Sequence, residues 1–200
     1  MRRVLNIGSL NYDRCYQVAD FVKAKETVSA LGYTTHLGGK GLNQSVALAR
    51  AGAAVSHAGA VGAEDGAALL EYLNAAGVDV SRVQRLDGPS GHAIIQINPQ
   101  GQNCILIFGG ANMCLGEADI DQVLSDFSPG DILLLQNETS CLAYAMERAK
   151  ALGLYIALNP SPINETLLRA PLHLADCLIL NEVEGAALAD GETEFEQILD

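Results

Sequence analysis

A glycine-rich segment, Gly38-Gly39-Lys40-Gly41-Leu42-Asn43, stands directly before a stretch with helical periodicity. Glycines let a ligand approach the backbone closely, and the start of a helix favours partial negative charge. The segment is not a phosphate loop of the form G-x-x-x-x-G-K-[ST], nor is it G-x-G-x-x-G, because Gln44 stands three residues after Gly41. The residues alone leave two interpretations open: a ligand-binding turn, or a flexible entry to an ordinary helix.

Polar side chains follow four of the expected strands, at the point where each apolar run ends. In an open α/β sheet, ligands bind beyond the carboxyl ends of the strands, and these ends lie along one edge. We therefore expect these polar residues to converge on one active site. They are Asn11 to Asp13, Asn137-Glu138, Asn159-Pro160, and Asn181 to Glu184.

Short apolar runs and longer amphipathic stretches alternate along the chain and must position these groups. After the glycine segment, Leu42, Val46 and Ala49 recur at helical spacing, and Gly52 marks the end of that helix. The alternation predicts an α/β fold with a mainly parallel sheet flanked by helices. The expected strands are 4–8, 55–62, 131–135, 154–158 and 177–180, and the other expected helices are 65–76, 117–126, 140–152 and one beginning near 181.

Further strand-like segments indicate antiparallel pairing beside the parallel sheet. Residues 27–31 and 33–37 have the composition of two strands of a small antiparallel element. Residues 93–97 and 104–108 flank a polar segment with Pro99 and Gly101, which is typical of a β-hairpin turn.

The composition narrows the class of protein and of partner. The 200 residues are 49% hydrophobic and carry a formal net charge of −12, a sign that repels nucleic acids and anionic membranes. No apolar stretch of about 18 residues occurs, and the N-terminal apolar run is too short for a secretory signal. The five cysteines are scattered without C-x-x-C spacing, which argues against a zinc site or a disulfide framework. We therefore expect a cytoplasmic protein without nucleic-acid or membrane partners.

The stretch from Gly38 to Gly62 resembles the first signature of the ribokinase-like (PfkB) carbohydrate kinases, with Asn43, Ser45 and Gly52 at the matching positions. The Gly-Gly-Lys-Gly form is most similar to the ribokinase branch of that family. The resemblance extends along the whole chain and corresponds to the N-terminal portion of the family. Further matching segments are Gly8 to Asp13, Ile107 to Asn112, Leu135 to Glu138, Ala157 to Pro162, and Asn181 to Glu184.

This resemblance implies a sugar site. Asp13 would accept hydrogen bonds from two sugar hydroxyls, Asn11 would offer a donor and an acceptor, and Glu138 would be a second carboxylate. From the residues alone, Asn11 to Asp13 could be an ordinary turn, and Glu138 an acid near a helix start. Lys40 alone would more often be a solvated charge. Further implied sugar contacts are Gly39, Lys40, Asn43, Ala93 and Ile95.

The resemblance also implies a nucleotide side with ATP as phosphoryl donor. Asn181 would lie near the nucleotide phosphates, and Glu184 would hold Mg²⁺ mainly through water, since magnesium keeps several of its waters. The alternative is that Asn181 and Glu184 form a capping box at a helix start, and both interpretations can hold together.

The family's architecture divides the chain into two parts. The sugar-binding core would comprise 1–13, 38–90 and 109–200, and a β-lid would comprise 14–37 and 91–108. The lid would cover the sugar and pair two subunits into a homodimer.

One departure from the family is large. Its second signature, Asp-Thr-x-Gly-Ala-Gly-Asp, supplies the catalytic base and the anion hole, and it does not occur in these 200 residues. The family's adenine-binding segments are missing as well. We therefore expect the C-terminal part of the fold to be missing, with no catalytic residue in this chain.

Three functional hypotheses follow. The first is a fragment of an ATP-dependent sugar kinase, inactive by itself, acting on a pentose such as ribose, or on a nucleoside or another sugar. The second is a non-enzymatic sugar-binding or dimerisation module. A nicotinamide-dependent oxidoreductase is a distant third, because no Rossmann fingerprint follows the first strand.

Overall fold

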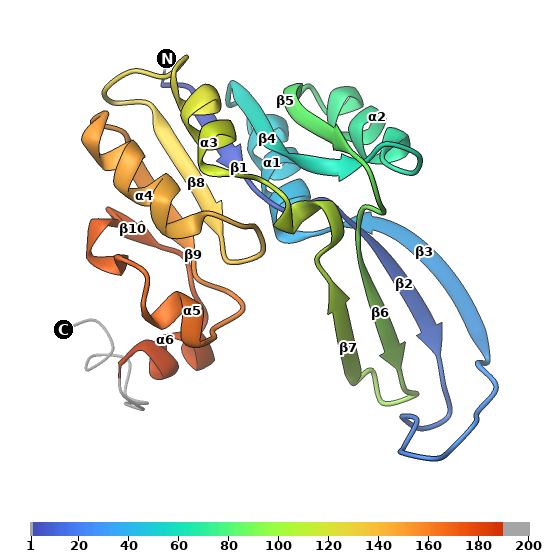
Figure 1. Ribbon diagram of the computed structural model, residues 1–200. Coiled ribbons are helices and arrows are strands. Elements are labelled where there is room, and N and C mark those ends of the chain that lie inside the picture. The colour runs from blue at the N-terminus through green and yellow to red at the C-terminus, as the bar shows by residue number, and fades with distance from the viewer. Residues whose placement is uncertain (1, 190–200) are drawn as a thin grey trace.

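The computed structural model describes residues 2–189, which form a parallel sheet with helices on both faces and a second, smaller sheet that projects from it (Figure 1). The main sheet has the strand order β10-β9-β8-β1-β4-β5, and every neighbouring pair is parallel. The predicted α/β class is therefore confirmed. The strands are β1 (Val4–Ile7), β4 (Val55–Gly62), β5 (Asp79–Leu86), β8 (Ile132–Gln136), β9 (Tyr155–Asn159) and β10 (Cys177–Leu178).

Helices cover both faces of this sheet because side chains alternate between the faces along each strand. Val4 of β1 packs in one cluster with α1 and α2, whereas Leu5 packs in the other with α3 and α4. Both side chains are buried, as expected of a central strand in a parallel sheet. The helices are α1 (Lys40–Arg50), α2 (Ala67–Ala75), α3 (Glu117–Leu124), α4 (Leu142–Ala151), α5 (Glu165–Leu168) and α6 (Glu182–Leu188), with 3-10 turns η1 (Gly110–Met113) and η2 (Leu172–Leu174).

The smaller sheet, called the lid below, has four strands in the order β3-β2-β6-β7. The outer pairs, β2–β3 and β6–β7, are antiparallel, whereas the central β2–β6 pair is parallel. Both central strands therefore leave the core in the same direction, and both edge strands return to it (Figure 1). The strands are β2 (Asn11–Gln17), β3 (Gly32–Gly38), β6 (Gly91–Ile97) and β7 (Asn103–Phe108), and the predicted hairpin joins the last two.

The lid begins earlier in the chain than the sequence indicated. Asn11 to Asp13, expected in the core after the first strand, lie in β2 and pair with both β3 and β6. The strand predicted over 27–31 is wrong, because β2 already pairs fully with residues 32–38 and residues 27–31 are exposed. The strand predicted over 177–180 shortens to two residues.

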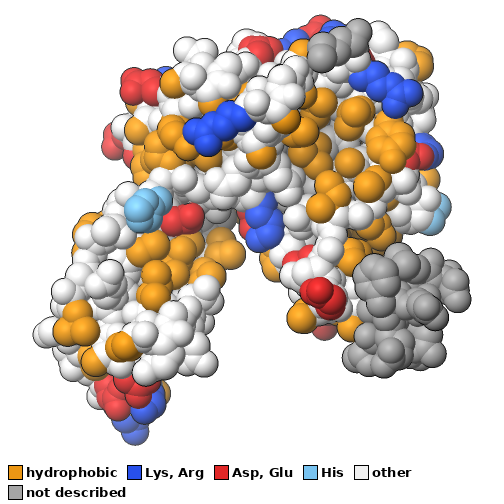
Figure 2. Space-filling view, turned by 180° about the vertical axis from the view of Figure 1, so that it is seen from behind, with side chains coloured by type: hydrophobic (Ala, Val, Ile, Leu, Met, Phe, Trp, Pro, Cys, Tyr) orange, Lys and Arg blue, Asp and Glu red, His pale blue; other side chains and the backbone are white. Residues whose placement is uncertain are grey.

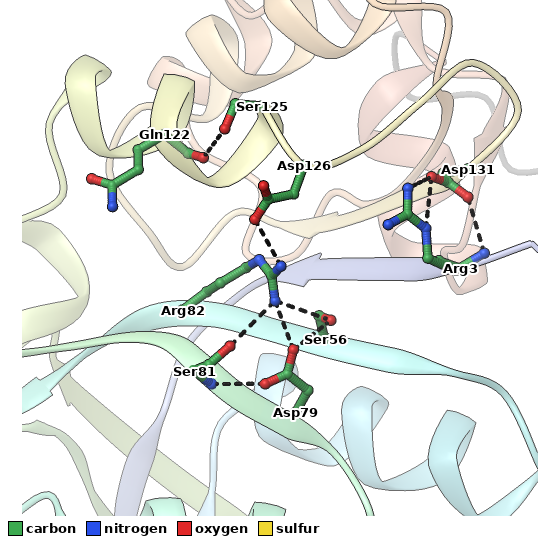
Figure 3. A network of polar contacts seen from close by, with 9 residues as sticks. All are labelled: Arg3, Ser56, Asp79, Ser81, Arg82, Gln122, Ser125, Asp126 and Asp131. Carbon is green, nitrogen blue, oxygen red and sulfur yellow. Dashed lines mark hydrogen bonds and ion pairs between the residues drawn. The ribbon is translucent and has the colours of Figure 1, made fainter.

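Two arginines tie the loops at the amino ends of the strands to the sheet (Figure 3). Arg82 of β5 pairs with Asp126, which follows α3, at 2.8 Å. Arg3, just before β1, donates from its backbone N and its Nε to Asp131, each at 3.1 Å. Both guanidinium groups lie near the ring of Phe127, at 4.8 Å and 5.5 Å from its centroid. These contacts fix the α3–β8 connection at the edge away from the polar strand ends.

Figure 2 shows the molecule from behind, with an open hollow between the core and the lid. Among residues 2–189, no helix combines the length and the apolar character that crossing a bilayer requires.

Candidate active site at the junction of core and lid

The site is built where β1 ends, β2 begins, and the loop after β8 meets the start of α1. Glu138 follows β8, and its side chain is only 8% exposed. It accepts hydrogen bonds from the backbone N of Lys40 at 3.1 Å, from Lys40 Nζ at 2.8 Å, and from the hydroxyl of Ser9. Three chain segments that are distant in sequence are thereby joined around one carboxylate.

The glycine segment fits closely against the β1–β2 connection. Gly39 has a φ of +93°, a left-handed conformation that suits glycine, and it is the N-cap residue of α1. A Cβ on Gly41 would stand 2.4 Å from the backbone N of Ser9, so only glycine permits this approach. The backbone N of Leu42 then donates to the carbonyl of Ser9 at 3.0 Å. The segment is thus a turn shaped by its neighbours and not a flexible helix entry.

Asp13 lies on β2, directly opposite His36 of β3 and Ala93 of β6. Burial, and after it the negative charge of Glu138, raises the pKa of the Asp13 carboxyl, while His36 and Lys40 partly offset this shift. A Cβ on Gly38 would stand 2.0 Å from Asp13 Oδ2, so glycine leaves room for that carboxylate. Asp13 therefore lies in the electrostatic reach of the Lys40–Glu138 pair.

The side chain of Asn11 is held in place by Asn112, a residue to which the sequence analysis assigned no role. Asn112, in η1, donates from Nδ2 to Asn11 Oδ1 at 2.8 Å, and its own Oδ1 accepts from the backbone N of Leu10 at 2.9 Å. Both asparagines are buried. The sequence signal for Asn112 was the family-matching segment Ile107 to Asn112, and that for Ser9 was the segment Gly8 to Asp13, but neither residue was predicted as a contact.

Three further predicted sugar contacts lie on strand β6 of the lid and on helix α1. Ala93 is 5% exposed and shares the face of the lid that carries Asp13. Ile95 lies two residues farther along β6, opposite Cys15, on the same face. Asn43 lies in the first turn of α1, where its backbone N donates to Gly39 O, and its side chain is exposed.

Asn181 and Glu184 lie at the carboxyl end of β10, on the same edge of the sheet but three strands from β1. They form a capping box: Asn181 Oδ1 accepts from the backbone N of Glu184 at 2.9 Å, and Glu184 Oε2 accepts from the backbone N of Asn181 at 3.1 Å. The predicted capping alternative is therefore observed. Among residues 2–189, no cluster of three acidic, histidine or cysteine side chains could hold a metal by itself.

Chemically, the junction brings together two carboxylates and one ammonium group. Ionised carboxylates accept hydrogen bonds, and an ammonium donates up to three, so together they suit a ligand with several hydroxyl groups. The short β1–β2 and β3–α1 connections place these groups where the lid joins the core.

Comparison with known proteins identifies the relatives of this chain. Ribokinase of Haemophilus influenzae is 34% identical to it, over 98% of this chain and 66% of that protein. Ribokinase of Staphylococcus aureus is 32% identical over the same shares. The crystal structure of Cryptococcus neoformans ribokinase in complex with ADP superposes with a TM-score of 0.81 at 32% identity, over 100% of this chain and 65% of that one.

A second solved structure, Arabidopsis thaliana ribokinase complexed with ribose and ATP, gives a TM-score of 0.80 at 30% identity, over 99% of this chain and 66% of that one. The chain thus spans about two thirds of the length of these relatives. The model of the pfkB family of carbohydrate kinases matches residues 1–199. The protein belongs to the pfkB family of carbohydrate kinases.

Proposed function

We propose that this chain supplies the sugar-binding part of an ATP-dependent sugar kinase, which transfers the γ-phosphoryl group of ATP to a hydroxyl of a pentose such as ribose. The observation that carries the proposal is the Lys40–Glu138 pair beside Asp13, where the lid joins the core. The relative complexed with ribose and ATP supports a sugar as the ligand of this site.

In the proposed mechanism, the chain's residues bind and orient the sugar. Asp13 and Glu138 accept hydrogen bonds from hydroxyl groups, and the Lys40 ammonium donates one while it holds Glu138 in place. The lid covers the bound sugar and excludes water. Further proposed contacts are Asn11, Gly39, Asn43, Ala93 and Ile95.

Phosphoryl transfer itself needs parts that these 200 residues do not supply. The sugar oxygen attacks the γ-phosphorus, the bond to the ADP oxygen breaks, and a base takes the hydroxyl proton; catalysis is mostly positioning and electrostatics. The family signature with that base and the anion hole does not occur in the sequence. We therefore propose that the chain alone binds sugar without turnover.

Asn181 and Glu184 are the proposed contacts on the nucleotide and magnesium side. Asn181 is exposed and Glu184 is partly exposed. A magnesium ion that keeps most of its waters needs only one or two protein carboxylates, so a partly exposed Glu184 fits such a contact. When bound, the ion would neutralise negative charge on the phosphates of ATP.

Titration calorimetry of the chain against ribose, deoxyribose, fructose, adenosine and inosine tests the proposal. We expect heat from at least one of these ligands, with ribose binding most tightly, and no phosphorylated product when ATP and Mg²⁺ are added. Absence of binding to every member of the panel would remove the proposed sugar site. Sustained turnover would remove the claim that the chain alone is inactive.

A non-enzymatic sugar-binding or dimerisation module remains the second candidate function. Its support is the lid strand β7, whose apolar side chains Ile105, Leu106, Ile107 and Phe108 are all at least 49% exposed. We propose that two lids pair through such side chains to form a homodimer. The free thiols of all five cysteines support a reducing compartment, and we propose the cytoplasm.

A further inference from the structure

A hydrogen-bonded chain of buried polar side chains lies beneath the candidate site. Asn6 of β1 and His57 of β4 are direct neighbours in the sheet register, and Ser45 of α1 packs above them. All three are 0% exposed, within the cluster formed by β1, β4 and α1. The proposed sugar contacts do not use any of them.

The donors and acceptors of these side chains allow one arrangement. Asn6 Nδ2 donates to Ser45 Oγ at 2.7 Å, the Ser45 hydroxyl donates to His57 Nδ1 at 2.8 Å, and His57 Nε2 donates to Gly8 O at 3.2 Å. The second hydrogen of Asn6 Nδ2 goes to Gly41 O at 2.8 Å. His57 is therefore neutral with its proton on Nε2, and burial lowers its pKa to about 4.

Both ends of this chain attach to the backbone beside residues that hold Glu138. Gly8 precedes Ser9, whose hydroxyl donates to Glu138. Gly41 follows Lys40, which donates to Glu138 twice. The Gly8 and Gly41 turns are therefore connected twice: through Glu138 at the candidate site, and through the buried Asn6–Ser45–His57 chain beneath it.

An apolar core would not define this geometry. Dispersion contacts tolerate small shifts, whereas hydrogen bonds between buried groups fix the distances and directions of the groups that they link. Gln136, at the end of β8, extends the linkage: its Nε2 donates to Asn6 Oδ1 at 2.9 Å and to Gln44 Oε1 at 2.7 Å. Strand β8, which leads into Glu138, is thereby tied to the same network.

We propose that Asn6, Ser45 and His57 are positioning residues that set the spacing of the Gly8 and Gly41 turns and thereby the affinity of the site for sugar. The inference rests on the proposed sugar-binding function and deepens it. Rigid alignment of the two turns is what lets Ser9 and Lys40 converge on one carboxylate.

Two substitutions of His57 separate positioning from volume. His57→Phe fills the space but leaves Gly8 O without this donor and the Ser45 hydroxyl proton without an acceptor, and we expect its affinity for ribose to fall about tenfold or more, the range for one lost buried hydrogen bond. His57→Gln keeps an amide donor for Gly8 O, and we expect it to restore the affinity to within about threefold. Ser45→Ala, which keeps α1 intact, should weaken binding by an intermediate factor.

A matched control removes one buried methyl group from the hydrophobic core and leaves the Asn6–Ser45–His57 network unchanged. Ile156 of β9 is fully buried in the cluster on the other face of the sheet. Ile156→Val should lower the midpoint of urea unfolding and leave the ribose affinity unchanged. Unchanged affinity in both His57→Phe and Ser45→Ala, or an affinity loss in Ile156→Val equal to theirs, would overturn the proposal.

A second readout separates a failure of this inference from a failure of the sugar-kinase proposal. Amide hydrogen exchange needs no ligand, and in His57→Phe we expect the amides of Gly41 and Leu42 to exchange at least about tenfold faster, while Leu73 of α2 changes little. If no sugar binds but this local pattern appears, the function is wrong and the positioning network stands. Uniformly faster exchange at all three amides would overturn the inference.

Discussion

At the scale of single residues, Asp13 is subject to opposing demands. Its carboxyl is half-buried and lies near Glu138, and both conditions raise its pKa. A raised pKa means that the folded state binds the proton more tightly than the unfolded chain does. Stability contributed by this group is therefore greatest at low pH and falls as the pH rises through the folded pKa. The proposed hydroxyl contacts nevertheless need the ionised form.

Replacing Asp13 by Asn should separate these demands. We expect the affinity for ribose to fall about 10- to 100-fold, because hydrogen bonds to a charged acceptor are lost. The midpoint of urea unfolding at pH 7 should rise, since the unfavourable charge is gone, and the two proteins should converge as the pH is lowered. Calorimetry and urea titrations between pH 4 and pH 7 measure both effects.

Asp20→Asn is the control for that substitution. Asp20 is exposed, forms an ion pair with Lys23 and accepts a hydrogen bond from the backbone N of Phe21, so its replacement by Asn should change neither affinity nor stability beyond a few tenths of a kcal/mol. An Asp13→Asn protein that binds ribose as tightly as the original would refute the assigned role.

Sequence patterns identified the charged members of the site but not their supports. Asp13, Lys40 and Glu138 were detectable because they follow strands or belong to a family signature. Asn6 and His57 interrupt apolar runs, and nothing in the sequence indicates that they are neighbours on adjacent strands. Such pairings depend on strand register, which is set by the whole sheet and not by local periodicity.

At the scale of elements, the packing of α1 against the β1–β2 connection depends on Gly41. Its ideal Cβ would lie 2.4 Å from Ser9 N and 2.5 Å from Gly8 C, both backbone atoms that cannot rotate away. The helix therefore cannot keep its place if a side chain is added there.

Gly41→Ala should accordingly lower the free energy of unfolding by about 1–3 kcal/mol, the usual range for overpacking, and weaken ribose binding as well. Gly116→Ala is the matched control: Gly116 is also a glycine at a helix start, but its φ is −103° and the nearest atom to its Cβ is at 3.6 Å. It should lose about 1 kcal/mol at most. Urea unfolding of both variants measures these losses in the free energy of unfolding. Equal losses in Gly41→Ala and Gly116→Ala would contradict the argument that the packing of α1 depends on Gly41.

Most elements of the core were predictable, whereas the lid was predicted only in part. Helix α1 and strand β4 match their expected ranges because their apolar periodicity is strong. Strand β2 was missed because it begins with the polar sequence Asn11-Tyr12-Asp13, which is equally typical of a turn. Its parallel pairing with β6 joins segments about 80 residues apart, and no local signal encodes that contact.

At the scale of the whole molecule, β7 is an edge strand with exposed apolar side chains on both faces. Unprotected edges and apolar surfaces of this kind favour association with another copy. Leu106 is 67% exposed, and Ile107, on the opposite face, is 49% exposed. Either face could carry the proposed contact between two lids.

Lysine substitutions at these two positions test the proposed homodimer and identify the face involved. Sedimentation velocity should show a dimer for the original chain and a dissociation constant at least about tenfold higher for Leu106→Lys or Ile107→Lys, depending on the face that pairs. Leu168→Lys, in α5, is a control at another exposed leucine. A monomeric original chain at micromolar concentration would exclude the dimer.

The parallel pair at the centre of the lid has a mechanical consequence. The chain passes between core and lid four times, at Gly8 to Leu10, at Gly39, at Asp87 to Ser90 and at Gly109. Because four connections along its base attach the lid to the core, twisting of the lid and sliding of the lid along the core are both resisted. Bending at these connections is the motion that remains. The lid should therefore bend toward and away from the core. A single proteolytic cut at the tip of the β6–β7 hairpin would leave all four connections between lid and core intact.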